Sequence, residues 1–401
     1  MQRSVEIYRS VPRYAAARVL STTLPRLSST PAAPLRLVRR NGPALPGPRW
    51  GRVRPRLSGI CGSDLSTVSG TSSFYFSPLV SMPFTPGHEV VGDLLDDVDD
   101  LPAGTRVVVD PLLTCVPRGL DPCDACRDGA RSRCDRITIG HLSPGLQTGF
   151  CADTGGGWSE GLVAHRSQLH PVPDELPDER AVLVEPLACA IHTALRLAPR
   201  EGDDVLVVGA GAVGLFTILA LRAYTSAGRI TAVAKHPKQQ ELALRLGATD
   251  VVAPREALAG VRRSTRALRV QPEQGSPYLL GGVAGAIDAA GSKASLDTAL
   301  RATRAGGRVV LSGMPPAGVD LSPAWFRELE VVGSYATGLE PVDGGRSSFD
   351  LALDLAGTAP LDDVAQSSYP LERWREALDH AGDAGRLGTV KVHFDLREMT
   401  R

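Results

Sequence analysis

A glycine-rich turn between a buried strand and a helix places the strongest constraint on the fold of this chain. The run Val205–Val208 is entirely aliphatic and leads directly into Gly209-Ala210-Gly211-Ala212-Val213-Gly214. In this setting the first glycine permits a tight turn, the second lets the backbone approach a pyrophosphate, and the third allows close packing of the helix. The unpaired N–H groups at the helix N-terminus favour phosphate oxygens. The motif therefore predicts a dinucleotide site formed by Gly209, Gly211, Val213 and Gly214.

Helices and strands alternate through the second half of the chain. Further strands are expected at residues 230–234, 286–288, 308–311 and 330–332, and helices at 213–223 and 239–246. Gly247, directly after the second of these helices, is a typical C-terminal helix residue. Strands separated by helices indicate a doubly wound parallel sheet. The arginine-rich stretch 254–282 is expected to be a solvated helix and loop.

The first 185 residues have a different texture, with many prolines and glycines between short β-like runs. This pattern is typical of an irregular, mainly β domain. The end of the chain, with a helix expected at 371–380 and a strand at 390–392, is expected to rejoin that domain. We therefore divide the chain into a first domain at 1–185, a dinucleotide-binding domain at 186–334 and a return segment at 335–401.

The first forty residues are basic and contain one acid, Glu6. This composition is similar to that of an organelle transit peptide. However, Val5-Glu6-Ile7-Tyr8 alternates like a strand. We favour an ordinary first strand followed by a basic loop.

The bulk composition excludes several classes of protein. The 44 basic and 44 acidic residues cancel, which gives no global attraction to nucleic acid or anionic membranes. The most apolar stretch, 205–221, contains a turn and is too short to span a membrane. Seven cysteines in 401 residues do not resemble a small secreted disulfide scaffold. We expect a cytoplasmic protein with a small-molecule substrate and without nucleic-acid or membrane partners.

The end of the second expected strand selects the cofactor. An NAD site usually places Asp or Glu there to bind the ribose 2′-hydroxyl. Here the strand ends at Ala234, and Lys235 and Lys238 follow it. A 2′-phosphate avoids repulsion by an acid at this position and is attracted by the lysines, which favours NADP. The alternative is that both lysines are solvated residues at the start of a helix, which leaves NAD open.

Four of the seven cysteines lie close together in the sequence. Cys115, Cys123, Cys126 and Cys134 have the spacing Cys-x7-Cys-x2-Cys-x7-Cys, and the central pair can grip one tetrahedral ion. Because four protein ligands leave no open position, a zinc ion held here is structural. Two disulfides and a redox-active Cys-x2-Cys are the alternatives.

A second metal site is indicated by a thiol, an imidazole and a carboxylate that precede the glycine motif. Cys61 begins Cys61-Gly62-Ser63-Asp64, His88 lies in Gly87-His88-Glu89, and Glu185 is followed by Pro186. Three protein ligands leave a fourth zinc position open for chemistry. Three neighbours are expected to act as a proton relay, an orienting carboxylate and a supporting or alternative ligand: Ser63, Asp64 and Glu89.

With these motifs in this order, the chain resembles the zinc-containing medium-chain alcohol dehydrogenase superfamily from about Arg52 onwards. The shared segments are Gly59–Asp64, Pro86–Glu89, the four-cysteine segment, Glu185–Leu187 and the Gly209 motif. The resemblance implies a GroES-like catalytic domain interrupted by a Rossmann domain, with one catalytic and one structural zinc, in a homodimer or homotetramer. It also implies hydride transfer between NADP(H) and an alcohol or carbonyl substrate, in which zinc polarises the oxygen and Ser63 relays the proton.

Two departures from the family pattern refine these expectations. Glu185 stands where liver-type enzymes have their second cysteine, as in the polyol, glucose and threonine dehydrogenase branch, where this carboxylate binds zinc directly or through water. Leu120 stands where the family has the first cysteine of the structural lobe, and Cys115 lies farther upstream. We expect a polyol, sugar or other secondary alcohol as substrate, with the physiological direction open. The alternative function is a non-catalytic nucleotide-binding member of the same fold.

Overall fold

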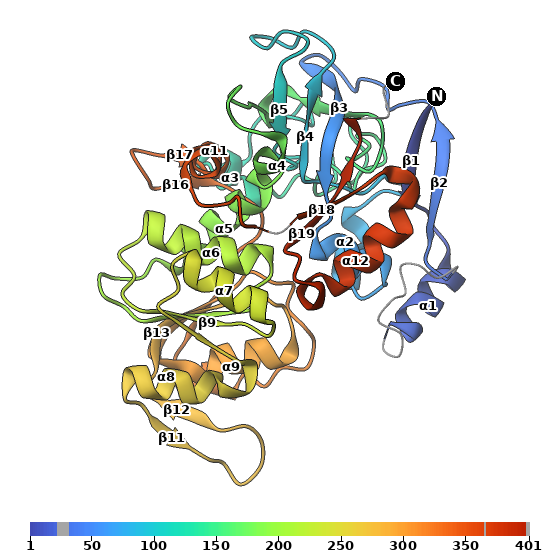
Figure 1. Cartoon of the computed structure of the whole chain (residues 1–401). Coiled ribbons are helices and arrows are strands. Elements are labelled where there is room, and N and C mark those ends of the chain that lie inside the picture. Colours follow the sequence, from blue (N-terminus) through green and yellow to red (C-terminus); the bar gives the residue numbers. More distant parts are fainter. Residues whose placement is uncertain (22–31, 365, 398–401) are drawn as a thin grey trace. The chain divides into compact units, whose positions relative to one another are not determined.

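The computed structural model describes residues 1–21, 32–364 and 366–397. The chain forms two compact units (Figure 1). The first unit combines Met1–Glu185 with Ala352–Arg401, and the second unit is Pro186–Leu351. The chain leaves the first unit at Glu185. It returns inside helix α11 (Ser348–Thr358), later than residue 335, because this helix continues without a break across the boundary.

The second unit contains a six-stranded sheet in which all neighbouring strands are parallel. In sheet order its strands are β10 (Asp250–Val252), β9 (Ile230–Val233), β8 (Val205–Val208), β13 (Val283–Asp288), β14 (Thr303–Leu311) and β15 (Glu330–Gly333). This order is that of a doubly wound nucleotide-binding sheet, and the winding direction reverses between β8 and β13. Such sheets bind ligands at this switch point. The expected α/β architecture is confirmed.

Helices connect the strands of this sheet. They are α6 (Ala212–Tyr224), α7 (Pro237–Arg245), α8 (Ala257–Thr265), α9 (Lys293–Ala302) and α10 (Ser322–Phe326), and α5 (Val184–Leu197) precedes β8. Among the described residues, no helix combines the length and the apolar composition needed to cross a membrane.

The central strands are buried because they are aliphatic on both faces. No residue of β8 is more than 4% exposed. Leu206 and Val208 belong to one apolar cluster with Val309 of β14 and with Leu296 and Leu300 of α9. Strands covered on both faces appear as continuous apolar runs in a sequence, which is why this part of the fold could be predicted.

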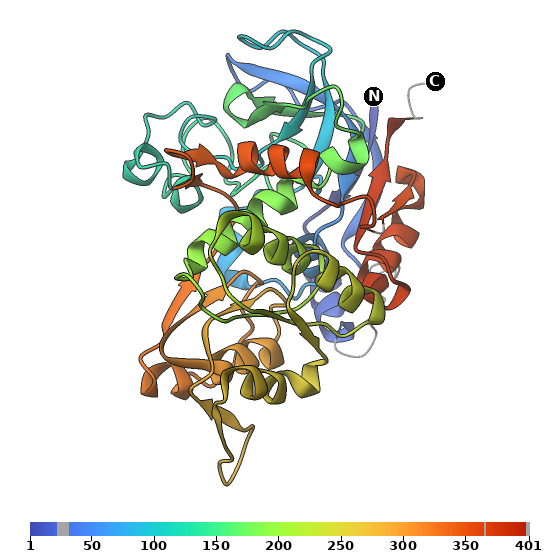
Figure 2. The ribbon, with the colours of Figure 1, turned by 60° about the vertical axis from the view of Figure 1, so that its left-hand side comes forward.

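The stretch 254–282 differs from the sequence expectation. Helix α8 is present, but a hairpin of β11 (Leu268–Val270) and β12 (Tyr278–Leu280) replaces part of the expected loop. Figure 2 shows this hairpin in gold, projecting from its unit. Each strand has three residues, and of these six residues Leu279 is the buried one. Strands this short carry no alternating pattern from which to predict them.

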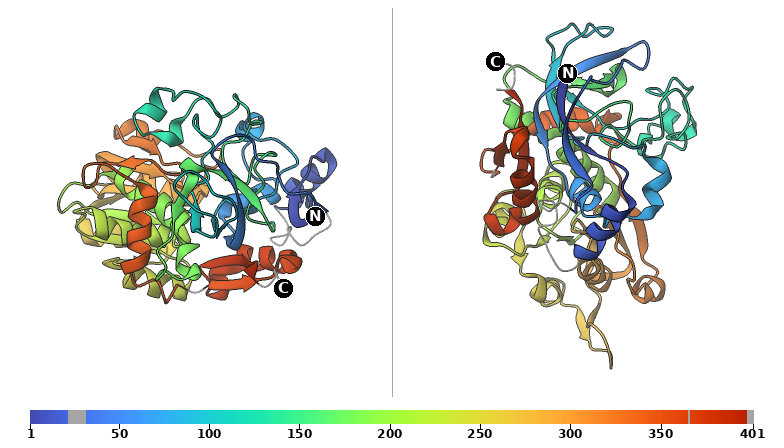
Figure 3. Two further views of the ribbon diagram at one scale, coloured as in Figure 1. Left: turned by 90° about the horizontal axis from the view of Figure 1, so that it is seen from above. Right: turned by 90° about the vertical axis from the view of Figure 1, so that its right-hand side faces the viewer.

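The first unit is built on a mainly antiparallel sheet. Its strands follow the order β18 (Gln366–Tyr369), β19 (Lys391–Asp395), β3 (Trp50–Gly59), β4 (Val90–Leu94), β5 (Arg106–Val109) and β7 (Leu169–Pro171), and β6 (Leu162–His165) also pairs with β3. The return segment thus places β19 directly beside β3, with α12 (Trp374–Leu387) packed on β19. Figure 3 shows the return segment in red from two further directions.

The N-terminal segment is part of the first unit. The expected strand is present as β1 (Gln2–Ile7), but the following residues are not a plain loop, because they contain α1 (Val11–Leu20) and β2 (Leu35–Arg40). Strands β1 and β2 pair in antiparallel fashion. The side chain of Glu6 is 3% exposed and forms ion pairs with Arg36 at 2.6 Å and Arg40 at 3.0 Å. Some of the basic residues therefore neutralise a buried carboxylate.

Two buried histidines make the stability of the first unit sensitive to acid. Burial lowers the pKa of His165 to about 4 and that of His393 to about 4, whereas an unfolded histidine has a pKa of about 6.5. Between these values the unfolded chain binds more protons than the folded chain. The free energy of unfolding is therefore expected to fall as the pH decreases from about 6.5 to about 4, by at most about 1.4 kcal/mol per pH unit for each histidine.

Urea denaturation of the native protein and of His165→Asn at pH 7 and pH 5 checks this expectation. Asparagine keeps an oxygen that can accept the bond now made by the Ser167 amide to His165 Nδ1 at 3.1 Å, but it does not titrate. The variant should lose less stability between the two pH values than the native protein. Equal losses would contradict the assignment to His165.

Candidate metal centres and cofactor site

Cys61 is held at the start of a short helix in the first unit. It is the N-cap residue of α2 (Gly62–Val68), which follows β3. The Asp64 carboxylate accepts a hydrogen bond from the Cys61 backbone amide at 2.9 Å, and Asp64 is 1% exposed. Asp64 thus fixes the turn that presents the thiol. Ser63, the expected proton relay, lies in the same helical turn and is half-buried.

His88 and Glu89 lie at the entrance to β4, where they approach Cys61. Gly87 precedes them with a φ of +97°, and a Cβ at this glycine would lie 2.8 Å from the hydroxyl of Ser58. His88 is 4% and Glu89 1% exposed. One donor atom from each of Cys61, His88 and Glu89 lies within 4.8 Å of the others. The structure therefore groups Glu89 with the two expected ligands.

The donor set fits a zinc ion. His88 Nδ1 lies 3.5 Å from Asp64 Oδ1, and both atoms are buried without a hydrogen-bond partner. Burial lowers the pKa of His88, but Asp64 and Cys61 raise it more, so that this pKa is well above its usual value. A buried site that attracts positive charge and offers sulfur, nitrogen and oxygen donors has the chemistry that zinc prefers.

Lys391 is a site residue that the sequence analysis did not identify. It lies on β19, is 3% exposed and forms an ion pair with Glu89. Burial lowers its pKa, but Glu89, Cys61 and Glu185 raise it more, and the net effect is a raised pKa. Gly59 makes room for the pair, because a Cβ there would collide with the Glu89 carboxylate. The signal available in the sequence was a lysine between two valines of an expected strand.

The role of Glu185 as a zinc ligand, suggested by its position in the family pattern, stays a prediction. Glu185 lies in the first turn of α5 and is 7% exposed. It is not a member of the group formed by Cys61, His88 and Glu89, although its charge acts on Lys391. Glu89, the neighbour of His88 in the chain, does belong to that group.

The four-cysteine segment forms a second group of donor atoms. One sulfur from each of Cys115, Cys123, Cys126 and Cys134 lies within 4.8 Å of the others. The Cys115 and Cys134 sulfurs are 3.6 Å apart, and those of Cys123 and Cys134 are 4.0 Å apart. All four thiols are free, so the alternative of two disulfides is not realised here. Four converging thiols fit a tetrahedral zinc ion, and Cys115 belongs to the set despite its unusual spacing.

The three glycines of the motif have three different surroundings in the second unit. Gly209 has a φ of +107°, and a Cβ there would lie 2.9 Å from that of Ala290. At Gly214 a Cβ would collide with the carbonyl of Gly209, whereas at Gly211 it would meet no atom within 4 Å. Gly211 is the N-cap of α6, where Val213 is half-buried. The open space beside the backbone at the switch point of the sheet is suited to a pyrophosphate.

The two lysines after β9 differ in their partners. Ala234 is fully buried, and its amide donates to the carbonyl of Val252 at 3.0 Å. Lys238 is ion-paired with Glu241 at 2.9 Å, whereas Lys235 is exposed. Lys235 is therefore the more suitable of the two for a 2′-phosphate.

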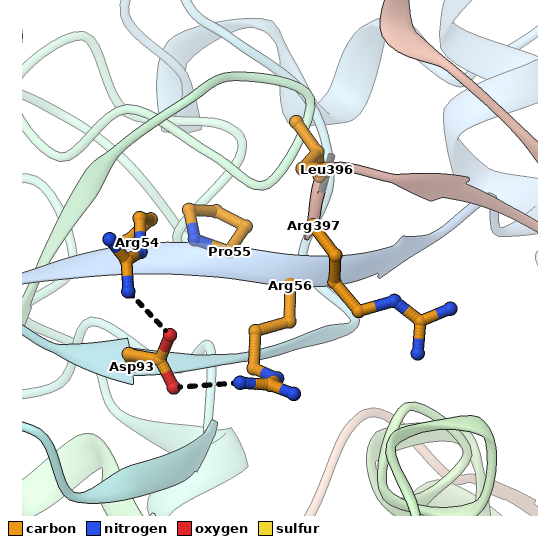
Figure 4. A pocket seen from close by; sticks show the side chains of 6 residues that line it. All are labelled: Arg54, Pro55, Arg56, Asp93, Leu396 and Arg397. Carbon is orange, nitrogen blue, oxygen red and sulfur yellow. Dashed lines mark hydrogen bonds and ion pairs between the residues drawn. The ribbon is translucent and has the colours of Figure 1, made fainter. Parts of the chain in front are cut away.

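A surface pocket of the first unit carries positive charge that is already neutralised. The pocket has a volume of about 220 Å³ and is lined by Arg54, Pro55, Arg56, Asp93, Leu396 and Arg397 (Figure 4). Asp93 forms ion pairs with Arg54 at 2.9 Å and Arg56 at 3.4 Å. Arg397 pairs with Glu179 at 2.9 Å. Because carboxylates already satisfy these arginines, the pocket is not an anion site.

The fold and the two groups of donor atoms define a zinc-type dehydrogenase. Residues 47–174 match the family described as alcohol dehydrogenase GroES-like domain, and residues 212–357 match the family described as zinc-binding dehydrogenase. Sorbitol dehydrogenase from Arabidopsis thaliana is 32% identical to this chain, over 87% of the chain and 89% of that protein. The chain belongs to the zinc-containing medium-chain alcohol dehydrogenase superfamily and is an enzyme, an oxidoreductase.

Further similarities agree with this assignment. L-idonate 5-dehydrogenase from Vitis vinifera is 28% identical, over 87% of this chain and 89% of that protein. The crystal structure of a zinc-binding dehydrogenase from Sinorhizobium meliloti 1021 bound to NADP is 25% identical, with a TM-score of 0.68, and the match covers 98% of this chain and 99% of that one. The combination of a GroES-like domain with a Rossmann domain, expected from the sequence, is confirmed.

The ion pair between Glu89 and Lys391 is expected to stabilise the folded protein. Replacing Lys391 with Met leaves a buried carboxylate without its partner, which typically lowers the free energy of unfolding by about 3–5 kcal/mol. Urea denaturation of the zinc-loaded protein, followed by tryptophan fluorescence, measures this loss. The double variant Lys391→Met/Glu89→Gln should recover most of it, and the exposed Lys293→Met serves as control. A Lys391→Met protein as stable as the control would show that the pair is not needed.

Proposed function

We propose that the enzyme transfers hydride between NADP(H) and a polyol, a sugar or a related secondary alcohol at a zinc centre held by Cys61 and His88. The observation that carries this proposal is the convergence of Cys61, His88 and Glu89 donor atoms within 4.8 Å in a chain that also has the Gly209 turn. Glu89 or Glu185 supplies a carboxylate ligand, directly or through water. The names of the sorbitol and idonate dehydrogenases support the substrate class.

Each side chain of the proposed centre has a distinct task. When bound, zinc would polarise the substrate oxygen and lower its pKa, while NADP would carry the hydride. Ser63 takes up the hydroxyl proton and relays it. Asp64 holds the Cys61 turn through the bond at 2.9 Å and faces His88. Lys391 fixes the Glu89 carboxylate on the side of β19.

The reaction is tested with Cys61→Ser and His88→Ala. Each change removes a ligand from the proposed catalytic zinc, so the zinc content should fall from two ions to one per chain and turnover should be lost. The dissociation constant for NADP should stay within about twofold of the native value, because the glycine motif is untouched. Assays with NADP and a panel of polyols, sugars, amino alcohols and simple alcohols identify the substrate class.

Cys151→Ser is the matched control for these variants. Cys151 is fully buried in the same unit, but it lies outside both groups of donor atoms. Its variant should keep two zinc ions and most of the activity. A Cys61→Ser protein with near-native kcat and one zinc ion per chain would overturn the proposed mechanism.

The preference for NADP is tested at the two lysines. Lys235→Glu should weaken NADP binding about tenfold or more, equivalent to about 1.4 kcal/mol or more, and should leave NAD binding nearly unchanged. Lys238→Glu should have a smaller effect, because Glu241 already neutralises that lysine. Fluorescence titration measures the dissociation constants. A native protein with a higher kcat/KM for NAD than for NADP would refute the preference.

We also propose a homo-oligomeric enzyme in the cytoplasm. Strand β15 forms an edge of the parallel sheet, and Val331 on it is 40% exposed. In the neighbouring helix α10, Trp325 is 83% and Phe326 65% exposed. An open edge with exposed apolar side chains is suited to pairing with a second copy of the chain. The crowding of four cysteines between positions 115 and 134 suggests a metal site and is compatible with a reducing compartment.

A further inference from the structure

Arg118 is an arginine buried inside the lobe that carries the four cysteines. It lies between Cys115 and Cys123 in the chain and is 0% exposed. Its guanidinium donates five hydrogen bonds, with lengths between 2.7 and 3.2 Å, and every acceptor is a backbone carbonyl: Leu113, Ile139, Leu142, Ser143 and Gly145. Carboxylates are absent from these acceptors, although buried arginines usually pair with one.

The backbone around Arg118 brings the outlying cysteine into its group. The amides of Arg118 and Leu120 both donate to the Cys115 carbonyl, at 3.1 and 3.0 Å, and His141 donates to the Arg118 carbonyl at 3.3 Å. The Cys123 amide donates to the Cys115 sulfur at 3.3 Å. Residues 115–120 therefore fold back against residues 137–145, with the guanidinium between them. This fold allows Cys115 to reach Cys123 across the long spacing.

The charge of Arg118 needs a partner in this environment. Taking a guanidinium out of water is unfavourable unless negative charge compensates it. Burial lowers the pKa of Arg118, whereas Cys151, Cys134, Asp153 and Cys115 act in the opposite direction. Two of these four groups belong to the four-cysteine group. A divalent ion with four thiolates carries two net negative charges, so each charge would stabilise the other.

A second buried arginine, Arg327, offers a comparison, because its guanidinium also bonds to backbone carbonyls but no cysteine is among the groups that act on its pKa. Arg327 of the second unit is 4% exposed and donates to the carbonyls of Leu279, Leu300 and Thr303. Burial lowers its pKa as well, and the groups that act on it are Tyr278 and Arg301. Arg327 thus resembles Arg118 in its burial and in its bonds to backbone carbonyls. It differs because the groups that act on its pKa include no thiol.

We propose that Arg118 is a positioning residue of the four-cysteine centre, where its buried positive charge compensates the zinc–thiolate group and determines how firmly the metal is retained. This inference rests on the proposed structural zinc. On this inference the segment between Cys115 and Cys123 does more than connect two zinc ligands, because it also supplies the positive charge of Arg118. The carbonyl bonds place the guanidinium, and its charge acts on the metal centre.

The test measures zinc release from the full-length protein with a chromogenic chelator. Arg118→Gln removes the charge and keeps a donor, and Arg118→Lys keeps the charge and loses most of the carbonyl bonds. If charge retains the metal, zinc leaves Arg118→Gln at least tenfold faster than the native protein, while Arg118→Lys stays within about threefold. Arg327→Gln is the matched control and should release zinc at the native rate, even where its melting temperature falls.

The outcomes separate this inference from the proposal on which it rests. A native protein without zinc on the four cysteines refutes the structural zinc itself. A native protein that holds this zinc, together with equally fast release from the Lys and Gln variants, overturns the role of charge. If Arg118→Gln does not fold, Arg118→Lys alone decides, because near-native release supports the inference and tenfold faster release contradicts it.

Discussion

The ion pair between Glu89 and Lys391 is the interaction on which the first unit depends. It joins the start of β4 to β19, two segments from opposite parts of the chain. Each partner alone would be a buried charge without compensation, which is strongly destabilising. The pair forms only when β19 lies beside β3. The order of the strands in the sheet and the charge balance at the candidate zinc centre therefore depend on each other. Gly59 has no side chain and therefore leaves space for the side chains of Glu89 and Lys391.

The two groups of candidate metal ligands are positioned by different means. Cys61 and His88 lie at the ends of regular elements, where a helix N-cap and a glycine turn fix their direction. The four cysteines lie on a segment with little regular structure, and Arg118 organises it through backbone carbonyls. A group that must keep an open position for substrate benefits from rigid elements beneath it. The four-cysteine group, whose ligands would fill the coordination shell of a zinc ion, needs only a loop that holds the cysteines in place.

Much of the fold could be predicted because its signals are local. The aliphatic run of β8 followed by Gly209 defines a strand, a turn and a helix within ten residues, and the close spacing of Cys123 and Cys126 is visible in the same way. The roles of Lys391 and Arg118 depend on contacts with distant segments, which a single sequence does not reveal. The family pattern favoured Glu185 over Glu89 as the carboxylate ligand of zinc, whereas the structure groups Glu89 with Cys61 and His88. Helix α1 was missed because its arginines gave the segment the composition of a loop.

The discontinuity of the first unit has a consequence for biosynthesis. Residues Pro186–Leu351 form a complete unit that can fold as soon as it leaves the ribosome, because domains generally fold as units during synthesis. The earlier unit must wait for β19 to emerge before its sheet is complete. Until then the Glu89 carboxylate has no Lys391 to pair with. The unit that contains the Gly209 turn is therefore complete before the unit that contains the candidate zinc ligands Cys61 and His88, although the ribosome makes most of the latter unit first.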